Sequence, residues 1–115
     1  MAAPQERRRH PRLQREERAV VHRSRREDDS PFPLALYGNT LDISASGMQL
    51  VMKQALLPGD AVEVVIHVQG HRELFHLSGE TRWVAPIPGE KTYRMGVEII
   101  DTRSPDYAAW RQLFG

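Results

Sequence analysis

The stretch that decides the fold is residues 41–50, which read Leu-Asp-Ile-Ser-Ala-Ser-Gly-Met-Gln-Leu. Leu41 and Ile43 have the two-residue spacing of one apolar strand face. Met48 and Leu50 have the same spacing and continue that face on the next strand. Because the residues between the two pairs are small or polar, the stretch predicts two strands joined by a short turn, a β-hairpin.

Three residues of this hairpin are candidates for binding a ligand. Asp42 and Ser44 are two residues apart, so in an extended strand both point away from the apolar face. Gly47 predicts a backbone that takes a positive φ or is closely approached by another group. A carboxylate, a hydroxyl and an open backbone could together bind a ligand that carries N–H donors and phosphates. Alternatively, Asp42 and Ser44 only cap the turn through backbone hydrogen bonds.

Strands are also expected on both sides of the hairpin. The clearest alternation runs through residues 61–68, where the four apolar positions of one face are Val62, Val64, Ile66 and Val68. The other strands are expected at 19–22, 34–43, 47–52, 73–84 and 93–99. Gly38 and Asn39 are a possible break in the second strand, and Gly79 is a candidate bulge in the fifth.

A helix is expected at about residues 104–114. Ser104 can cap its first turn, Pro105 suits the first helical position, and Asp106 complements the positive end of the helix dipole. The apolar residues that follow have the spacing of one helix face: Tyr107, Trp110, Leu113 and Phe114. Six short strands and one helix predict an all-β fold with a C-terminal helix, and the pattern suits a small antiparallel barrel.

Length and composition limit the class of protein. The 115 residues, 40% of them hydrophobic, suit one domain with one core. The chain contains no apolar run that could span a membrane, no secretory signal and no cysteine, so we expect a cytoplasmic protein without membrane insertion. Nine of the arginines lie in residues 1–29, which is where an anionic ligand would bind.

The arginine-rich segment contains a second motif. Arg8-x-x-x-Arg12 precedes Asp42-x-Ser44-x-x-Gly47 by about thirty residues, and the two together resemble the signature of the PilZ family. The resemblance implies a six-stranded antiparallel β-barrel with a C-terminal helix. It also implies a bacterial receptor for the second messenger cyclic di-GMP. We therefore expect a flexible arm at 1–14 and the barrel domain at 15–115.

The resemblance also implies roles for the matched residues. Arg8 and Arg12 would clamp guanine edges and phosphates, since arginine binds the guanine O6 and N7 acceptors and phosphate bidentately. Asp42 and Ser44 would hold a guanine at the barrel rim beside Gly47. Arg7 resembles the version of the motif that binds a stacked pair of ligand molecules. We expect the segment 7–12 to become ordered on the ligand and to signal to an unidentified downstream protein.

Other functions fit the sequence less well. The main alternative is a protein-interaction module of the same fold that binds no ligand. A nucleic-acid binder is disfavoured, because residues 30–115 are net acidic and no aromatic residues interleave the arginines. An enzyme is not expected, since Asp42 and Ser44 show no nucleophile elbow.

A metal site is not expected either, because His67, His71 and His76 straddle a predicted turn without an acidic partner at fixed spacing. Among the aromatic residues, Trp83 and Trp110 are expected to pack in the core or against the helix. Trp83, Arg94 and Gly96 are secondary candidates for contacting a ligand.

Overall fold

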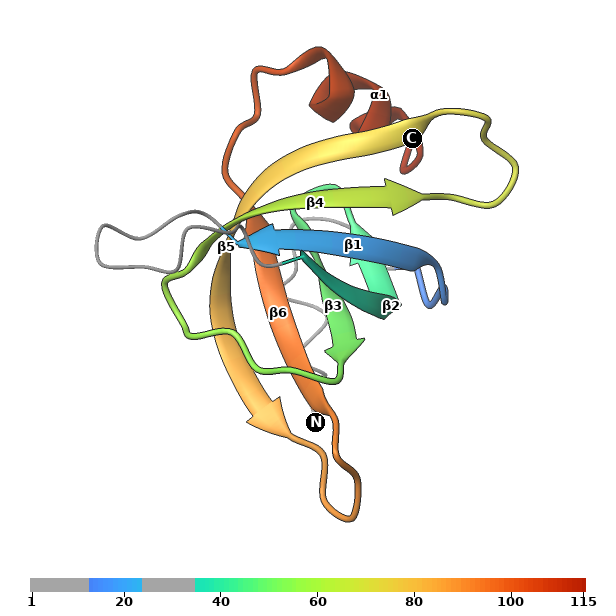
Figure 1. The fold of residues 1–115 in the computed structure, drawn as a ribbon. Helices are drawn as coiled ribbons and strands as arrows, with labels where there is room; N and C mark the ends of the chain where they lie inside the picture. Colours follow the sequence, from blue (N-terminus) through green and yellow to red (C-terminus); the bar gives the residue numbers. More distant parts are fainter. Residues whose placement is uncertain (1–12, 24–34) are drawn as a thin grey trace, which may run out of the picture.

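The computed structural model describes residues 13–23 and 35–115 of the chain. Within these residues the chain forms six strands and one helix (Figure 1): β1 (Arg18–Arg23), β2 (Ala35–Ser44), β3 (Gly47–Met52), β4 (Ala61–His67), β5 (Leu74–Pro86), β6 (Tyr93–Ile99) and α1 (Pro105–Gln112). The expected site residues Arg7, Arg8 and Arg12 lie outside the described residues.

The six strands close into an antiparallel barrel in the order β1-β2-β3-β6-β5-β4. Closure comes from β1, which pairs with β2 on one side and with β4 on the other, where Val21 lies opposite Val64. The expected all-β fold with a C-terminal helix is confirmed, and so is the barrel that the family resemblance implied. Since a closed barrel leaves no unpaired strand edge, a ligand would have to bind on its outer surface or at its ends.

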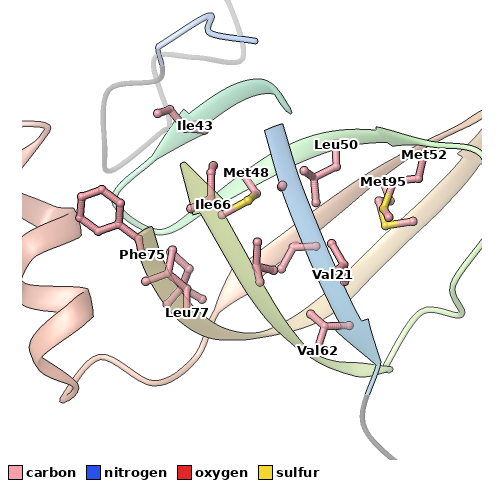
Figure 2. Close-up of a cluster of buried hydrophobic side chains, with 14 of the residues drawn as sticks. Val21, Ile43, Met48, Leu50, Met52, Val62, Ile66, Phe75, Leu77 and Met95 are labelled. Atoms are coloured by element: carbon pink, nitrogen blue, oxygen red, sulfur yellow. The ribbon is translucent and has the colours of Figure 1, made fainter. Parts of the chain in front are cut away.

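The barrel interior is filled by the apolar positions that the sequence patterns predicted (Figure 2). Val62, Val64 and Ile66 of β4 are buried as predicted, and so is Val68, which directly follows the strand. Met48 and Leu50 from β3 and Met95 from β6 meet them in the same cluster. Burying each such side chain contributes roughly 1.5–3 kcal/mol to folding.

Three expected strand details are wrong. Leu41 does not share the core face of Ile43: it is 42% exposed, whereas Ile43 is fully buried. The cause is an irregularity in β2, where Thr40 pairs with Leu50 and Asp42 with Gln49, so Leu41 is an extra residue that the β3 ladder skips.

The irregularity in β5 likewise lies between Thr81 and Trp83 instead of at Gly79. Gly79 has a different role, because a Cβ there would lie within 3.0 Å of the Glu98 carbonyl oxygen. Nor does β2 break at Gly38, through which its pairing with β1 and β3 continues.

The C-terminal helix α1 begins as predicted. The Ser104 hydroxyl accepts a hydrogen bond from the Tyr107 backbone N–H at 3.0 Å, Pro105 opens the helix, and Asp106 accepts from the His76 backbone N–H at 2.7 Å. Trp110 is fully buried in the core and makes an edge-to-face contact with Phe75 of β5. None of the described helices is long and apolar enough to cross a membrane.

Candidate functional site

The β2–β3 hairpin brings Asp42, Ser44 and Gly47 together as the sequence predicted. Ser44 pairs with Gly47 across the two-residue turn, and Asp42 pairs with Gln49 on the outer side of the barrel wall. The inward-facing pair between them is Ile43 and Met48, both buried in the core. The hairpin therefore displays a polar row outside and an apolar row inside.

Ser44 is held by the hairpin itself. Its side chain is 1% exposed, and its hydroxyl lies 3.2 Å from the Ser46 hydroxyl and donates to the Gly47 carbonyl at 3.3 Å. The Ser44 carbonyl accepts a hydrogen bond from the Trp110 indole Nε1–H at 3.0 Å. Ser44 thus links the turn to the C-terminal helix, and its hydroxyl already has partners.

Gly47 is required by the packing of β3 on β6. Its φ is not positive, and a Cβ built there would lie within 3.0 Å of the Val97 carbonyl oxygen. Of the two expectations for this glycine, close approach is the correct one, and the approaching group is the β6 backbone. Gly47 also lines a small hollow on the barrel surface, so its expected contact with a ligand stays a prediction.

Asp42 begins a row of residues that crosses four strands. The half-buried Asp42 accepts a hydrogen bond from the Gln49 side-chain Nε2 at 3.0 Å. Gln49 of β3 lies opposite Gly96 of β6, and Gly96 lies opposite Trp83 of β5. We call these four residues, Asp42, Gln49, Gly96 and Trp83, the outer row.

A hollow of about 290 Å³ lies along the outer row between β3, β6 and the irregular part of β5. A Cβ at Gly96 would lie within 3.0 Å of the Trp83 indole, so the missing side chain lets the ring lie against the β6 backbone. Trp83 nevertheless stays 36% exposed, and the Arg94 guanidinium carbon lies 5.6 Å from its ring centroid. The expectation of core packing is right for Trp110 and wrong for Trp83.

Arg82 is the extra residue of the β5 irregularity and forms the charged side of the hollow. Its Nε donates to the Glu98 Oε1 at 2.7 Å, and its Nη1 donates to the Glu80 Oε2 at 3.0 Å. The hydrogen bond to Glu98, followed by the charge of Glu80, raises the pKa of Arg82 above its usual value. Arg82 is therefore cationic at any physiological pH and already engaged with two carboxylates.

The described chain enters the barrel beside Asp42. Leu13 pairs with Ile43 through two backbone hydrogen bonds, from the Leu13 N–H to the Ile43 carbonyl at 2.8 Å and from the Ile43 N–H to the Leu13 carbonyl at 2.9 Å. The residue that precedes Leu13 in the sequence is Arg12, the second arginine of the first motif. The first described residue after that motif is thus paired with the residue next to Asp42.

A larger hollow, of about 890 Å³, lies elsewhere on the barrel, over β1, β2 and β4. Its lining includes Val20, Tyr37, Val65 and Leu74, and contains no carboxylate among the described residues. The smaller hollow adjoins Gln49, the hydrogen-bond partner of Asp42, whereas the larger hollow is lined by neither residue. In residues 13–23 and 35–115, no group of three or more His, Asp or Glu residues could hold a metal ion.

The sequence analysis did not single out Gln49, and it kept Trp83 as a secondary candidate. Gln49 stands between the core residues Met48 and Leu50, so its polar side chain had to face outward. Its pairing with Asp42 could have been found by folding residues 42–49 about the predicted turn. The Trp83 ring lies against Gly96 because of the pairing register between β5 and β6. No local sequence pattern reveals that register.

Comparison with known proteins gives one family match. The family model described as PilZ domain matches residues 6–114. No curated protein matches the chain.

Several solved structures share the fold. The inhibitor of motility MotI/DgrA of Bacillus subtilis is 17% identical with a TM-score of 0.69, over 94% of this chain and 49% of that one. YcgR of Escherichia coli in complex with c-di-GMP is 19% identical with a TM-score of 0.66, over 93% of this chain and 43% of that one. The PilZ domain of YcgR with c-di-GMP is 18% identical with a TM-score of 0.62, over 94% and 88% of the two chains. The chain thus spans about half the length of the first two proteins.

Proposed function

The chain belongs to the PilZ family, and on that premise we propose that it is a cyclic di-GMP receptor whose ligand binds along the outer row. The YcgR structures in complex with c-di-GMP support the ligand class, because they share the fold. The arrangement of this chain's own residues supports the place. We propose a cytoplasmic, non-enzymatic role in which the ligand is bound and released unchanged.

One observation carries the proposal: Asp42 and Trp83 stand at opposite ends of one row, with a hollow between them. A guanine offers N1–H and 2-amino donors on one edge, and a carboxylate can accept both. Its flat ring can stack on an exposed indole, which is worth about 1–3 kcal/mol per base. The Asp42 carboxylate and the Trp83 ring therefore supply the two kinds of contact that a guanine needs.

The arginines would come from the arm that precedes Leu13. Consecutive Cα atoms lie about 3.8 Å apart, and Leu13 pairs with Ile43, so we propose that the Arg12 side chain would reach a ligand at Asp42. Arg7 and Arg8 would supply further bidentate contacts to guanine edges and phosphates. Fixing each arm residue costs about 1–2 kcal/mol, and each charge-assisted hydrogen bond returns roughly 1.5–3 kcal/mol. A short ordered segment is therefore feasible, and its new surface would signal to a partner protein.

Isothermal titration with cyclic di-GMP tests the proposal, with linear pGpG, GTP and a short DNA as competitors of related chemistry. Asp42→Asn keeps an oxygen that can accept from Gln49 but removes the charge, and we expect at least tenfold weaker binding. Glu63→Gln, an exposed carboxylate on β4, is the matched control and should bind like the wild type.

Arg8→Ala and Arg12→Ala test the arginine motif in the same titration. Each should abolish or strongly weaken the heat of cyclic di-GMP binding while the unfolding midpoint stays unchanged. Equal affinity for cyclic di-GMP in the wild type, Asp42→Asn and Arg12→Ala would contradict the proposed site.

A ligand-independent interaction module of the same fold is the second candidate function. The observation in its favour is that Ser44 and Gly47 are fully accounted for by packing and by hydrogen bonds within the hairpin. The motif could therefore persist without a ligand. Absence of any heat with cyclic di-GMP at high micromolar protein would favour this second function.

A further inference from the structure

The pairing register between the incoming chain and β2 changes between Leu13 and the start of β1. Leu13 lies opposite Ile43, whereas Arg18 lies opposite Asn39. The incoming chain therefore takes five steps where β2 takes four, and the extra residue prevents a regular ladder between them. Backbone groups in this segment need partners other than those of a β-sheet.

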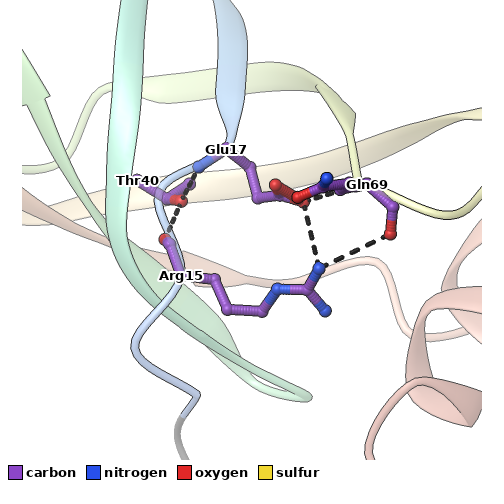
Figure 3. Close-up of polar contacts among 4 residues, drawn as sticks. All are labelled: Arg15, Glu17, Thr40 and Gln69. Atoms are coloured by element: carbon purple, nitrogen blue, oxygen red, sulfur yellow. Dashed lines mark hydrogen bonds and ion pairs between the residues drawn. The ribbon is translucent and has the colours of Figure 1, made fainter.

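The side chain of Thr40 supplies those partners (Figure 3). Its hydroxyl donates to the Arg15 carbonyl and accepts from the Glu17 backbone N–H at 2.8 Å. The Thr40 backbone N–H donates to the Glu17 carbonyl at 2.8 Å. Thr40 is fully buried, and its one hydroxyl satisfies a backbone N–H in a buried hydrogen bond and a backbone carbonyl in a partly buried one.

Glu17 ties the same segment to the turn between β4 and β5. Its carboxylate, 7% exposed, accepts from the Gln69 backbone N–H at 2.7 Å and lies 3.8 Å from the Arg15 Nη2. The Arg15 Nη2 also donates weakly to the Gln69 carbonyl at 3.5 Å. Figure 3 shows the Arg15 side chain turned toward Gln69 by these contacts. We call Arg15, Glu17, Thr40 and Gln69 together the entry clamp.

We propose that the entry clamp sets the affinity for cyclic di-GMP by holding residues 13–17, which follow the arginine motif in the sequence, in place beside β2. Thr40 and Glu17 are buried and would not touch the ligand, so they are positioning residues. Thr40 lies two residues before Asp42 on β2, and the clamp thus holds the base of the arm in register with the carboxylate. An arm that starts from a fixed point loses less conformational freedom on binding. This inference rests on the proposed function.

The test compares Thr40→Val, which removes the hydroxyl at constant shape, with Thr40→Ser, which keeps it, in the full chain. Thr81→Val is the matched control, because Thr81 is equally buried and its hydroxyl has no hydrogen-bond partner among the described residues. Two quantities are measured: the Kd for cyclic di-GMP by titration, and amide hydrogen exchange at Leu13 and Glu17, with Val64 as the core reference.

We expect Thr40→Val to raise the Kd about tenfold and to lower the exchange protection of Leu13 and Glu17 while Val64 keeps its protection. Thr40→Ser should restore the Kd to within about threefold of the wild type, and Thr81→Val should not change it. If Thr40→Val does not fold, Glu17→Gln takes its place, because it keeps an acceptor for Gln69 but loses the charge that orients Arg15.

The inference is overturned if Leu13 loses protection while the Kd is unchanged, if its protection does not fall, or if Thr81→Val weakens binding equally. A wild-type chain that binds no cyclic di-GMP is a different failure, since it removes the proposed function itself. If the wild type binds cyclic di-GMP and Thr40→Val binds it equally well, the inference about the entry clamp is refuted and the proposed function is not.

Discussion

The closed and the open ends of the β2–β3 hairpin differ in what their polar residues do. At the closed end, Ser44 and Gly47 are buried against β6 and linked to Trp110 of the helix. At the open end, Asp42 and Gln49 bond to each other beside a hollow that reaches Trp83.

One signature motif thus combines residues that build the corner with residues that face the proposed ligand site. Loss of ligand binding would therefore have different causes in variants at the two ends of the hairpin. A variant at Ser44 or Gly47 should act through the fold, because Ser44 is buried and hydrogen-bonded within the hairpin and Gly47 is packed closely on the β6 backbone. A variant at Asp42 or Trp83 should act on the ligand with the barrel intact. The four predictions below separate these two effects, beginning with the largest.

Gly47→Ala should be the most destructive single change. Its Cβ would press on the Val97 carbonyl, and neither strand can retreat inside a closed barrel, so we expect a loss of about 3 kcal/mol in the free energy of unfolding. Urea unfolding measures it. Gly59→Ala is the control: Gly59 has φ +93° but open space around it, so only backbone strain of about 1–2 kcal/mol is expected. An equal loss in both variants would mean that close packing at the corner does not matter.

Trp110→Phe should have the next largest effect. It removes the donor to the Ser44 carbonyl and leaves space in the core, so about 2 kcal/mol of stability should be lost. Thermal unfolding measures it, with Trp83→Phe on the exposed surface as the control. If both tryptophan variants unfold at the same temperature, the link between helix and hairpin contributes nothing.

Trp83→Ala should weaken cyclic di-GMP binding by about tenfold to a hundredfold, the effect of losing one stacking platform. Its free energy of unfolding should change by no more than about 1 kcal/mol, because the ring lies on the surface against Gly96. Titration and urea unfolding of the same sample measure both. Unchanged affinity for cyclic di-GMP in a folded Trp83→Ala variant would contradict a role for Trp83 in ligand binding.

Arg82→Gln should have the smallest effect on stability. Its ion pairs with Glu80 and Glu98 are exposed, and exposed pairs often contribute nothing measurable. Because its pKa is raised, any stabilising contribution of its charge is present below the ordinary arginine pKa and lost only at still higher pH. The unfolding midpoint should therefore match the wild type at low and at high salt. A clear, salt-dependent drop would show that the charges stabilise the bulge.

The sequence predicted the parts of the fold that depend on local patterns. These parts each depend on a few neighbouring residues: the alternation in β4, the turn between Ser44 and Gly47, and the Ser104 cap. The bulges were missed or misplaced, because a bulge exists only relative to a partner strand. Leu41 is exposed since β3 offers it no partner, and nothing in residues 41–43 alone reveals this.

The candidate site was predictable only in part for the same reason. Asp42, Ser44 and Gly47 are close in sequence and could be recognised together. The surroundings of Trp83 depend on a glycine thirteen residues later, and the entry clamp joins Glu17 to residues on two other segments. The roles proposed for Arg7, Arg8 and Arg12 remain predictions from the motif.

The two indole N–H groups offer the most direct test of the central claim that cyclic di-GMP binds along the outer row. In a ¹H–¹⁵N spectrum of the full chain, the Trp83 signal should shift as cyclic di-GMP is added, because its ring borders the hollow. The Trp110 signal, from a buried group bonded to the Ser44 carbonyl, should stay nearly constant. Saturating ligand that moves Trp110 and leaves Trp83 in place, or that moves neither signal, would contradict the account.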